Sequence, residues 1–139
     1  HYFGKRLARR RRGGVLLTGA MGAIDGLPYM ANEAATKGYI QSLVKSLHAE
    51  FKEFGIHITV LITTPTDTPI VPQLGFNKDT MPMRPLSVEQ CVKEALLAFS
   101  ANRVTVMPGL KFRVMNALIP ASISRKVTGD LMKRNNKIV

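Results

Sequence analysis

The residues of this chain that could do chemistry are concentrated in the segment 18–37, between a short apolar run and a long helical pattern. It opens with a glycine-rich stretch, Thr18–Gly26. Glycines after a strand can bring the backbone close to a phosphate group, as in dinucleotide-binding turns. Here the glycines are spaced G-x-x-G-x-x-x-G, and Pro28 follows too soon for a long helix to open at Gly22. A phosphate-binding turn is therefore the less favoured hypothesis for this loop.

Glu33 and Lys37 are the next candidate pair, four residues apart near the start of a predicted helix. A glutamate is ionised near neutral pH, and a neighbouring ammonium group favours that form, so Glu33 has no proton to donate. A glutamate four residues before a lysine is also the favourable order for an ion pair on a helix surface, worth a few tenths of a kcal/mol. The residue types therefore favour a structural ion pair over catalysis by this pair.

Other reactive side chains lack partners at a useful spacing. His48, His57 and Cys91 are too scattered for a metal-ligand pattern. Ser42 and Ser46 have no accompanying histidine and aspartate pattern of a serine hydrolase. We expect neither a metal centre nor a hydrolase triad in this sequence.

Positive charge dominates the chain, whose formal net charge is +11, and the first 12 residues hold no acid. The run Arg9–Arg12 could bind phosphates of nucleic acid or of anionic lipid. No aromatic residue interleaves with it, so base stacking has little support. A solvated helix end is the preferred interpretation, because cations suit a helix C-terminus.

Hydrophobic periodicity and capping signals predict alternating helices and strands along the chain. They are a basic helix ending near Arg12, a buried strand at 15–18, a helix at 32–51, a strand at 56–62, a helix from the Ser87–Gln90 capping box to about residue 99, a strand at 104–107, and a tail of two short helices split at Pro120. A long loop at 63–85 carries most of the prolines. Alternating strands and helices imply parallel strands joined by right-handed crossovers.

The predicted fold is an α/β domain with a partial doubly wound, Rossmann-like parallel sheet of three strands and flanking helices. The first strand, 15–18, is short and wholly apolar, which is typical of an interior strand with neighbours on both sides. Since the chain starts at His1 rather than Met, we expect residues 1–139 to be a single half-domain. No apolar run reaches the length of a membrane-spanning helix and no signal peptide is visible, which favours a cytoplasmic location.

The segment 14–37 resembles the catalytic segment of the short-chain dehydrogenase/reductase family, in which a strand ends in a serine, a loop with a proline follows, and a helix opens with Y-x-x-x-K. The stretch Ala34–Tyr39 is similar to that helix's A-[AS]-[ST]-K-A-[AFY] pattern. Residues 54–60 resemble the family's G-I-x-V-x-x-V strand entry, Pro65–Thr68 its P-x-D-T, and Met107–Gly109 the residues near its last strand. The resemblance implies the C-terminal half of that domain.

The resemblance also implies roles for four positions. Lys37 matches the family lysine, which lowers the pKa of a catalytic tyrosine and contacts the nicotinamide ribose. Glu33 stands in the tyrosine position and Ala20 in the serine position. Thr68 keeps the position of a threonine that contacts the carboxamide, although it also suits a plain turn residue. The family's asparagine would precede His1.

Two functional hypotheses follow. The first is a short-chain dehydrogenase/reductase-like protein, with NAD or NADP as cofactor, that is catalytically impaired here because of Ala20, Glu33 and the absent cofactor half. The alternative is a non-enzymatic dimerising module with a phosphate-binding arm at Arg9–Arg12. Expected partners are a second copy bound through the 32–51 helix and the missing N-terminal half. The segment 107–139 is interpreted as substrate-lid and tail helices, with a membrane-surface helix as the less favoured option.

Overall fold

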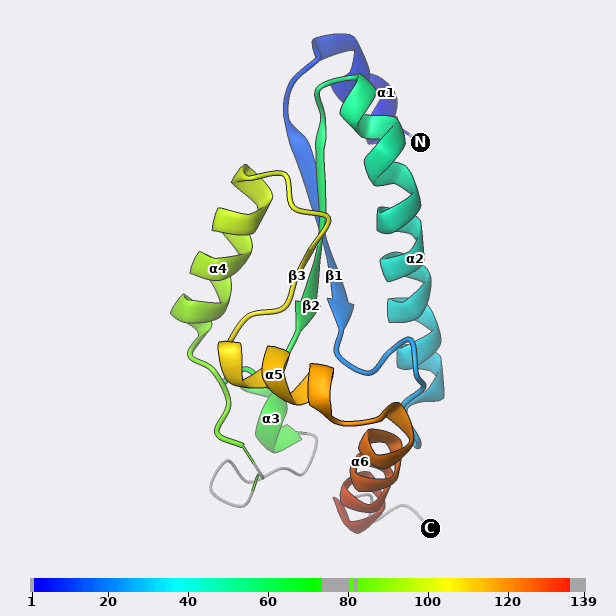
Figure 1. Ribbon diagram of the computed structural model, residues 1–139, viewed down its shortest axis with the longest axis vertical. Helices are drawn as coiled ribbons and strands as arrows, with labels where there is room; N and C mark the ends of the chain where they lie inside the picture. Colours follow the sequence, from blue (N-terminus) through cyan, green and yellow to red (C-terminus); the bar gives the residue numbers. More distant parts are fainter. Residues whose placement is uncertain (1, 74–80, 82, 136–139) are drawn as a thin grey trace.

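A computed structural model describes residues 2–73, 81 and 83–135 of the chain. Three parallel strands form one sheet in the order β1-β2-β3, with helices on both faces (Figure 1). The predicted α/β class and partial Rossmann-like sheet are therefore confirmed. The elements are α1 (Tyr2–Arg10), β1 (Gly14–Ala20), α2 (Ala31–Glu53), β2 (His57–Thr63), α3 (Ile70–Gln73), α4 (Val88–Ser100), β3 (Thr105–Val106), α5 (Leu110–Leu118) and α6 (Ala121–Asn135).

The two long helices sandwich the sheet. On the α2 side, Val44 packs against Ile58 and Val60 of β2. On the α4 side, Ala95 and Ala98 pack with Val106 of β3, and partly buried residues of β1 and β2 join them. Alternate residues of the central strand therefore face opposite helical layers, as expected for a strand that is buried on both faces.

The large apolar residues of α2 pack partly against the sheet. Leu47 and Phe51 lie against the core around Val44 within one chain, while Tyr39 is 66% exposed. The association of two copies through this helix stays a prediction.

The capping signal at α4 is half right. Ser87 is the N-cap residue, and its Oγ accepts a hydrogen bond of 3.2 Å from the Gln90 backbone N–H. The Gln90 side chain does not complete the reciprocal half of a capping box. It donates instead to Oε1 of Glu94, 2.9 Å away. The predicted loop at 63–85 also contains a short helix, α3, that the prolines concealed.

Gly14 fixes how closely β1 lies against β2. Gly14 pairs with His57 in the parallel register, and a Cβ placed at Gly14 would lie 2.5 Å from the His57 carbonyl oxygen. The Phe99 ring approaches the same point at 2.7 Å. Only glycine fits there, so Gly14 is required for β1 and β2 to pair in this register.

The outer edge of β1 faces away from β2. Gly13 and Gly19 direct their carbonyls toward β2, where they accept from the His57 N–H and the Thr63 hydroxyl. Backbone groups alternate sides along a strand, so the even residues of β1 direct theirs outward. Among the described residues, no protein partner is recorded for the outward peptide groups of Gly14 and Leu16. These groups form an open edge that can pair with another strand.

We expect Thr18→Pro to suppress strand-mediated association while the fold survives. The Thr18 N–H points outward, so proline there removes no β1–β2 hydrogen bond but blocks a neighbour at the edge. Analytical ultracentrifugation should show self-association weakened about tenfold or more. The matched control is Leu17→Pro, which removes an inward N–H and should unfold the chain. Equal association of Thr18→Pro and the parent would contradict an edge-driven contact.

Glu94 joins α4 to the start of α5. Its Oε2 accepts from the Gly109 N–H at 3.0 Å and lies 4.0 Å from the Arg113 guanidinium. Gly109 is the N-cap residue of α5, at φ +83°. The hydrogen bond from Gln90 lowers the pKa of Glu94, helped by Gly109 and Arg113 and opposed by burial. The ionised carboxylate therefore stabilises the position of α5.

The stability contributed by Glu94 should depend on pH. Because its folded-state pKa is lowered, the contribution is full above the unfolded pKa of about 4.3 and is lost as pH falls through the folded value. Glu94→Gln should cost about 1 kcal/mol of unfolding free energy near neutral pH, with the difference from the parent shrinking toward acid. Urea unfolding across pH measures this. The exposed Glu50→Gln should show no comparable trend, and a Glu94→Gln deficit that persists at acid pH would refute the assignment.

Candidate functional site

The predicted site residues lie at the carboxyl ends of β1 and β2 and on the first turns of α2. Ala20 ends β1 and pairs with Thr63, the last residue of β2. The loop 21–30 then leads to α2, which begins at Ala31. This is the edge of a parallel α/β sheet at which ligands usually bind.

Lys37 reaches from α2 to the outer edge of β1. Its Nζ donates to the Thr18 carbonyl oxygen, 3.3 Å away. One turn later on the same helix, Gln41 donates from Nε2 to the Ala20 carbonyl oxygen at 2.7 Å. Thr18 and Ala20 are even residues of β1, so these two side chains occupy outward carbonyls that a neighbouring strand would otherwise take. Lys37 thus has a structural task at this edge.

Gln41 is the residue that sequence analysis missed. It is only 2% exposed, and a buried amide needs hydrogen-bond partners. Its position four residues after Lys37 placed it on the same helix face. That spacing was the available signal, because a polar residue on the sheet-facing side of an amphipathic helix requires a polar target.

Glu33 stays apart from Lys37. It lies exposed in the first turn of α2, and no ion pair within 4.0 Å joins it to Lys37 in this described part of the chain. The expected i,i+4 ion pair is therefore wrong. The physical reason is that the Lys37 ammonium is drawn to the carbonyl of Thr18, an acceptor on the sheet, rather than to a solvated carboxylate.

Thr68 lies beyond β2 in the segment that precedes α3. Its hydroxyl is 3.5 Å from the Thr66 carbonyl oxygen, a long contact within its own turn. Thr66 forms a parallel bridge with Leu86. Buried Thr64 donates from Oγ1 to the Pro108 carbonyl oxygen at 3.3 Å and links this segment to the residues after β3. No hydrogen bond joins Thr68 to Lys37, Glu33 or Ala20 within the described residues.

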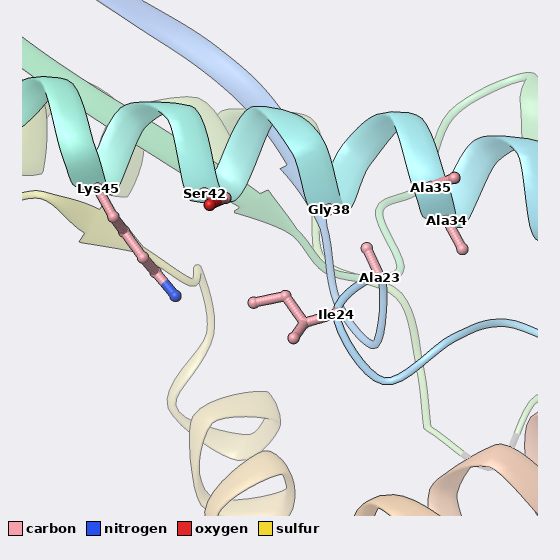
Figure 2. A pocket seen from close by; sticks show the side chains of 7 residues that line it. All are labelled: Ala23, Ile24, Ala34, Ala35, Gly38, Ser42 and Lys45. Carbon is pink, nitrogen blue, oxygen red and sulfur yellow. The ribbon is translucent and has the colours of Figure 1, made fainter.

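A cavity of about 430 Å³ lies beside this region, on the side of α2 that faces the loop after β1 (Figure 2). It is lined by Ala23, Ile24, Ala34, Ala35, Gly38, Ser42 and Lys45. Its walls are mostly small apolar side chains, and none of the four predicted site residues contributes to it. The cavity is therefore separate from the chemistry that the sequence predicted.

The glycine loop does not form a dinucleotide-binding turn. Such a turn delivers the chain directly into a helix whose N-terminus meets the phosphates. Here Gly22 and Gly26 take φ values of +75° and +87° inside the loop, and the helix starts only at Ala31. The Lys37 ammonium and the Thr68 hydroxyl at this edge are hydrogen-bond donors of the kind that a ribose or a carboxamide can accept. Among the described residues, this edge offers no cradle for the phosphates of a dinucleotide.

Two further properties concern membranes and metals. None of the described helices combines the length and apolarity needed to cross a membrane. No cluster of three or more His, Cys, Asp or Glu side chains arranged to hold a metal ion occurs in the described residues.

Comparisons with known proteins find similar sequences and similar folds. No protein-family model matches the chain. Over 71 residues it is 34% identical to a very-long-chain 3-oxoacyl-CoA reductase-like protein of Arabidopsis thaliana, a match covering 50% of this chain and 23% of that relative. The chain thus matches less than a quarter of this curated relative's length.

Solved structures match more of the chain. A short-chain dehydrogenase from Sphingobium yanoikuyae in complex with NADPH aligns with a TM-score of 0.65 at 20% identity, covering 98% of this chain and 50% of that one. A short-chain dehydrogenase/reductase family protein aligns with a TM-score of 0.64 at 27% identity, covering 77% and 50%. The chain spans about half the length of these structures. By sequence and fold together, the chain is similar to proteins of the short-chain dehydrogenase/reductase family.

Proposed function

We propose that the chain is the C-terminal half of a short-chain dehydrogenase/reductase domain and that, in this form, it does not catalyse hydride transfer. The observation that carries the proposal is the chemistry at the end of β1 and the start of α2. Ala20 offers only a methyl group where the family places a serine, and Glu33 an exposed carboxylate where the family places a tyrosine.

These two substitutions remove both groups that would act on a carbonyl substrate. A methyl group cannot donate a hydrogen bond to a developing oxyanion, and losing one such donor commonly costs about 10²-fold or more in rate. A solvated glutamate is ionised near neutral pH, so it cannot deliver the proton that a reduced carbonyl oxygen requires. The two losses fall on groups that act as a unit, so neither compensates for the other.

Two further positions, Lys37 and Thr68, match family residues that contact a nicotinamide cofactor, but they do not replace the missing catalytic groups. A bound nicotinamide cofactor would supply or accept the hydride. Lys37 and Thr68 are the residues of this chain that would hold its nicotinamide-ribose end. Lys37 already donates to the Thr18 carbonyl, so its position is held without a ligand. NAD or NADP is thus proposed as the cofactor of the whole domain, and binding by these residues alone should be weak.

The alternative function is a non-enzymatic interaction module. Helix α1 supports it, because none of its residues is buried and its last turn carries Arg9 and Arg10. The next two residues, Arg11 and Arg12, are also exposed. Such a helix could bind a polyanion or line the contact with a missing half. Such a module would act by binding and not by turnover. For both functions we propose a cytoplasmic location.

The chain should not oxidise NADH or NADPH with any ketone or aldehyde. Absorbance of the reduced nicotinamide measures the rate. Ala20→Ser with Glu33→Tyr should produce turnover only in a polypeptide that also holds the N-terminal half of a family member. The same polypeptide with Ala20 and Glu33 retained is the matched control. A protein-dependent rate in the unmodified chain would overturn the proposal.

The structural task of Lys37 and Gln41 can be measured separately from activity. Gln41→Leu should lower the unfolding free energy by about 1–2 kcal/mol, because it leaves the partly buried Ala20 carbonyl without its hydrogen-bond donor. Lys37→Met should cost less, about 0.5 kcal/mol, because its bond is longer and solvated. Urea denaturation measures both, with exposed Lys45→Met as control. A destabilisation by Gln41→Leu no greater than the control's would contradict the edge contact.

A further inference from the structure

Helix α5 carries an apolar stripe on its solvent side. Leu110, Val114 and Leu118 recur every four residues and are 67%, 47% and 75% exposed. The opposite side of the helix is anchored, since Phe112 is 1% exposed. Single exposed apolar residues are ordinary on protein surfaces, but a contiguous row marks an interaction face. We call these three residues the α5 stripe.

Cations flank the α5 stripe. At about 100° per residue, Lys111 and Arg113 fall on opposite sides of the row. Both are held in place, because the Lys111 ammonium donates to the Arg84 carbonyl and Arg113 lies 4.0 Å from Glu94. An apolar face bordered by basic residues is the composition of a helix that lies in the interface of a membrane.

The following helix extends the same pattern. Ile123 and Val127 of α6 are each 53% exposed, and Lys126, Lys133 and Arg134 are exposed beside them. Residues 107–139 hold seven Lys or Arg and one acid, Asp130. Both helices lie at the end of the molecule where β1 and β2 end (Figure 1). We call Lys126, Lys133 and Arg134 the tail cations.

A second exposed apolar row differs from the α5 stripe in the charge beside it. Val88, Val92 and Leu96 of α4 have the same four-residue spacing and are 43–54% exposed. This row is bordered by an acid and a base, Glu89 and Lys93, whereas Lys111 and Arg113 beside the α5 stripe are both positive. An anionic surface would therefore attract the α5 stripe more strongly than the α4 row.

We propose that the α5–α6 end of the chain docks on an anionic lipid surface, with the α5 stripe entering the headgroup region and the tail cations facing the phosphates. The proposal is independent of catalysis, because it rests on α5 and α6 and uses none of Ala20, Glu33 or Lys37.

Flotation with phosphatidylcholine vesicles, with and without phosphatidylserine, tests it on the 139-residue chain. Flotation separates vesicle-bound protein from aggregates, which sink. Binding should require phosphatidylserine and should fall about tenfold when salt rises from about 0.1 M to about 1 M, since the screening length shortens from about 10 Å to about 3 Å. Absence of flotation with phosphatidylserine vesicles, or binding equal on both vesicles, overturns the proposal.

The variant Leu110→Ser, Val114→Ser, Leu118→Ser should lose at least about tenfold of the vesicle binding. Circular dichroism checks that its helices remain. If it fails to fold, the tail-cation variant Lys126→Gln, Lys133→Gln decides, since both residues are exposed; it should weaken flotation several-fold, and unchanged flotation overturns the proposal.

The matched control is Val88→Ser, Val92→Ser, Leu96→Ser on α4, which should float like the parent. Replacing Arg9–Arg12 by glutamine should change flotation by less than about twofold; a larger loss there than in the α5 variant assigns lipid binding to α1 and overturns the proposal. The parent chain could instead fail to float and self-associate without vesicles, with that association lost in the α5 variant. This result would make the α5 stripe a contact between copies and overturn the proposal.

Discussion

The outer edge of β1 is the constraint on which the rest of the structure depends. A parallel strand leaves half of its peptide groups facing away from its only neighbour, and unpaired backbone groups out of water are costly. This chain satisfies part of that edge with side chains. Lys37 and Gln41 take the carbonyls of Thr18 and Ala20, and toward Gly14 the edge stays open. Together with the packing of Val44 against β2, those two bonds hold α2 against β1 beside the candidate site.

The same bonds give Lys37 a structural contact that does not depend on catalysis. In the family the lysine acts through a tyrosine four residues earlier, yet here Lys37 has a protein acceptor of its own. Gly14 allows β1 to lie close to β2, and buried Gln41 joins α2 to the end of β1 beside Lys37. Lys37 therefore contributes to the sheet edge whether or not a carbonyl is reduced beside it. Exposed Glu33 carries no such structural demand.

Much of the fold was predictable because it rests on local signals. Apolar runs placed β1 and β2, and Ser87 placed the start of α4 through a bond between neighbours in sequence. What failed depended on tertiary placement. The spacing of Glu33 and Lys37 favoured an ion pair, but the Lys37 ammonium donates instead to the Thr18 carbonyl oxygen, 19 residues away in sequence. The need for Gly14 also arises from His57 and Phe99, which no local pattern reveals.

Charge, more than apolar area, distinguishes the exposed apolar rows of α4 and α5. The rows on α4 and α5 expose comparable apolar side chains at the same spacing, so hydrophobicity cannot tell them apart. The neighbouring charges can, because Glu89 and Lys93 beside the α4 row are of opposite sign, whereas Lys111 and Arg113 beside the α5 stripe are both positive. The Glu94 carboxylate then fixes the start of α5, through Gly109, at the carboxyl end of the sheet. The carboxylate that caps α5 thus also sets which way its basic, apolar face is presented, and it does so at the same end of the sheet as Ala20 and Lys37.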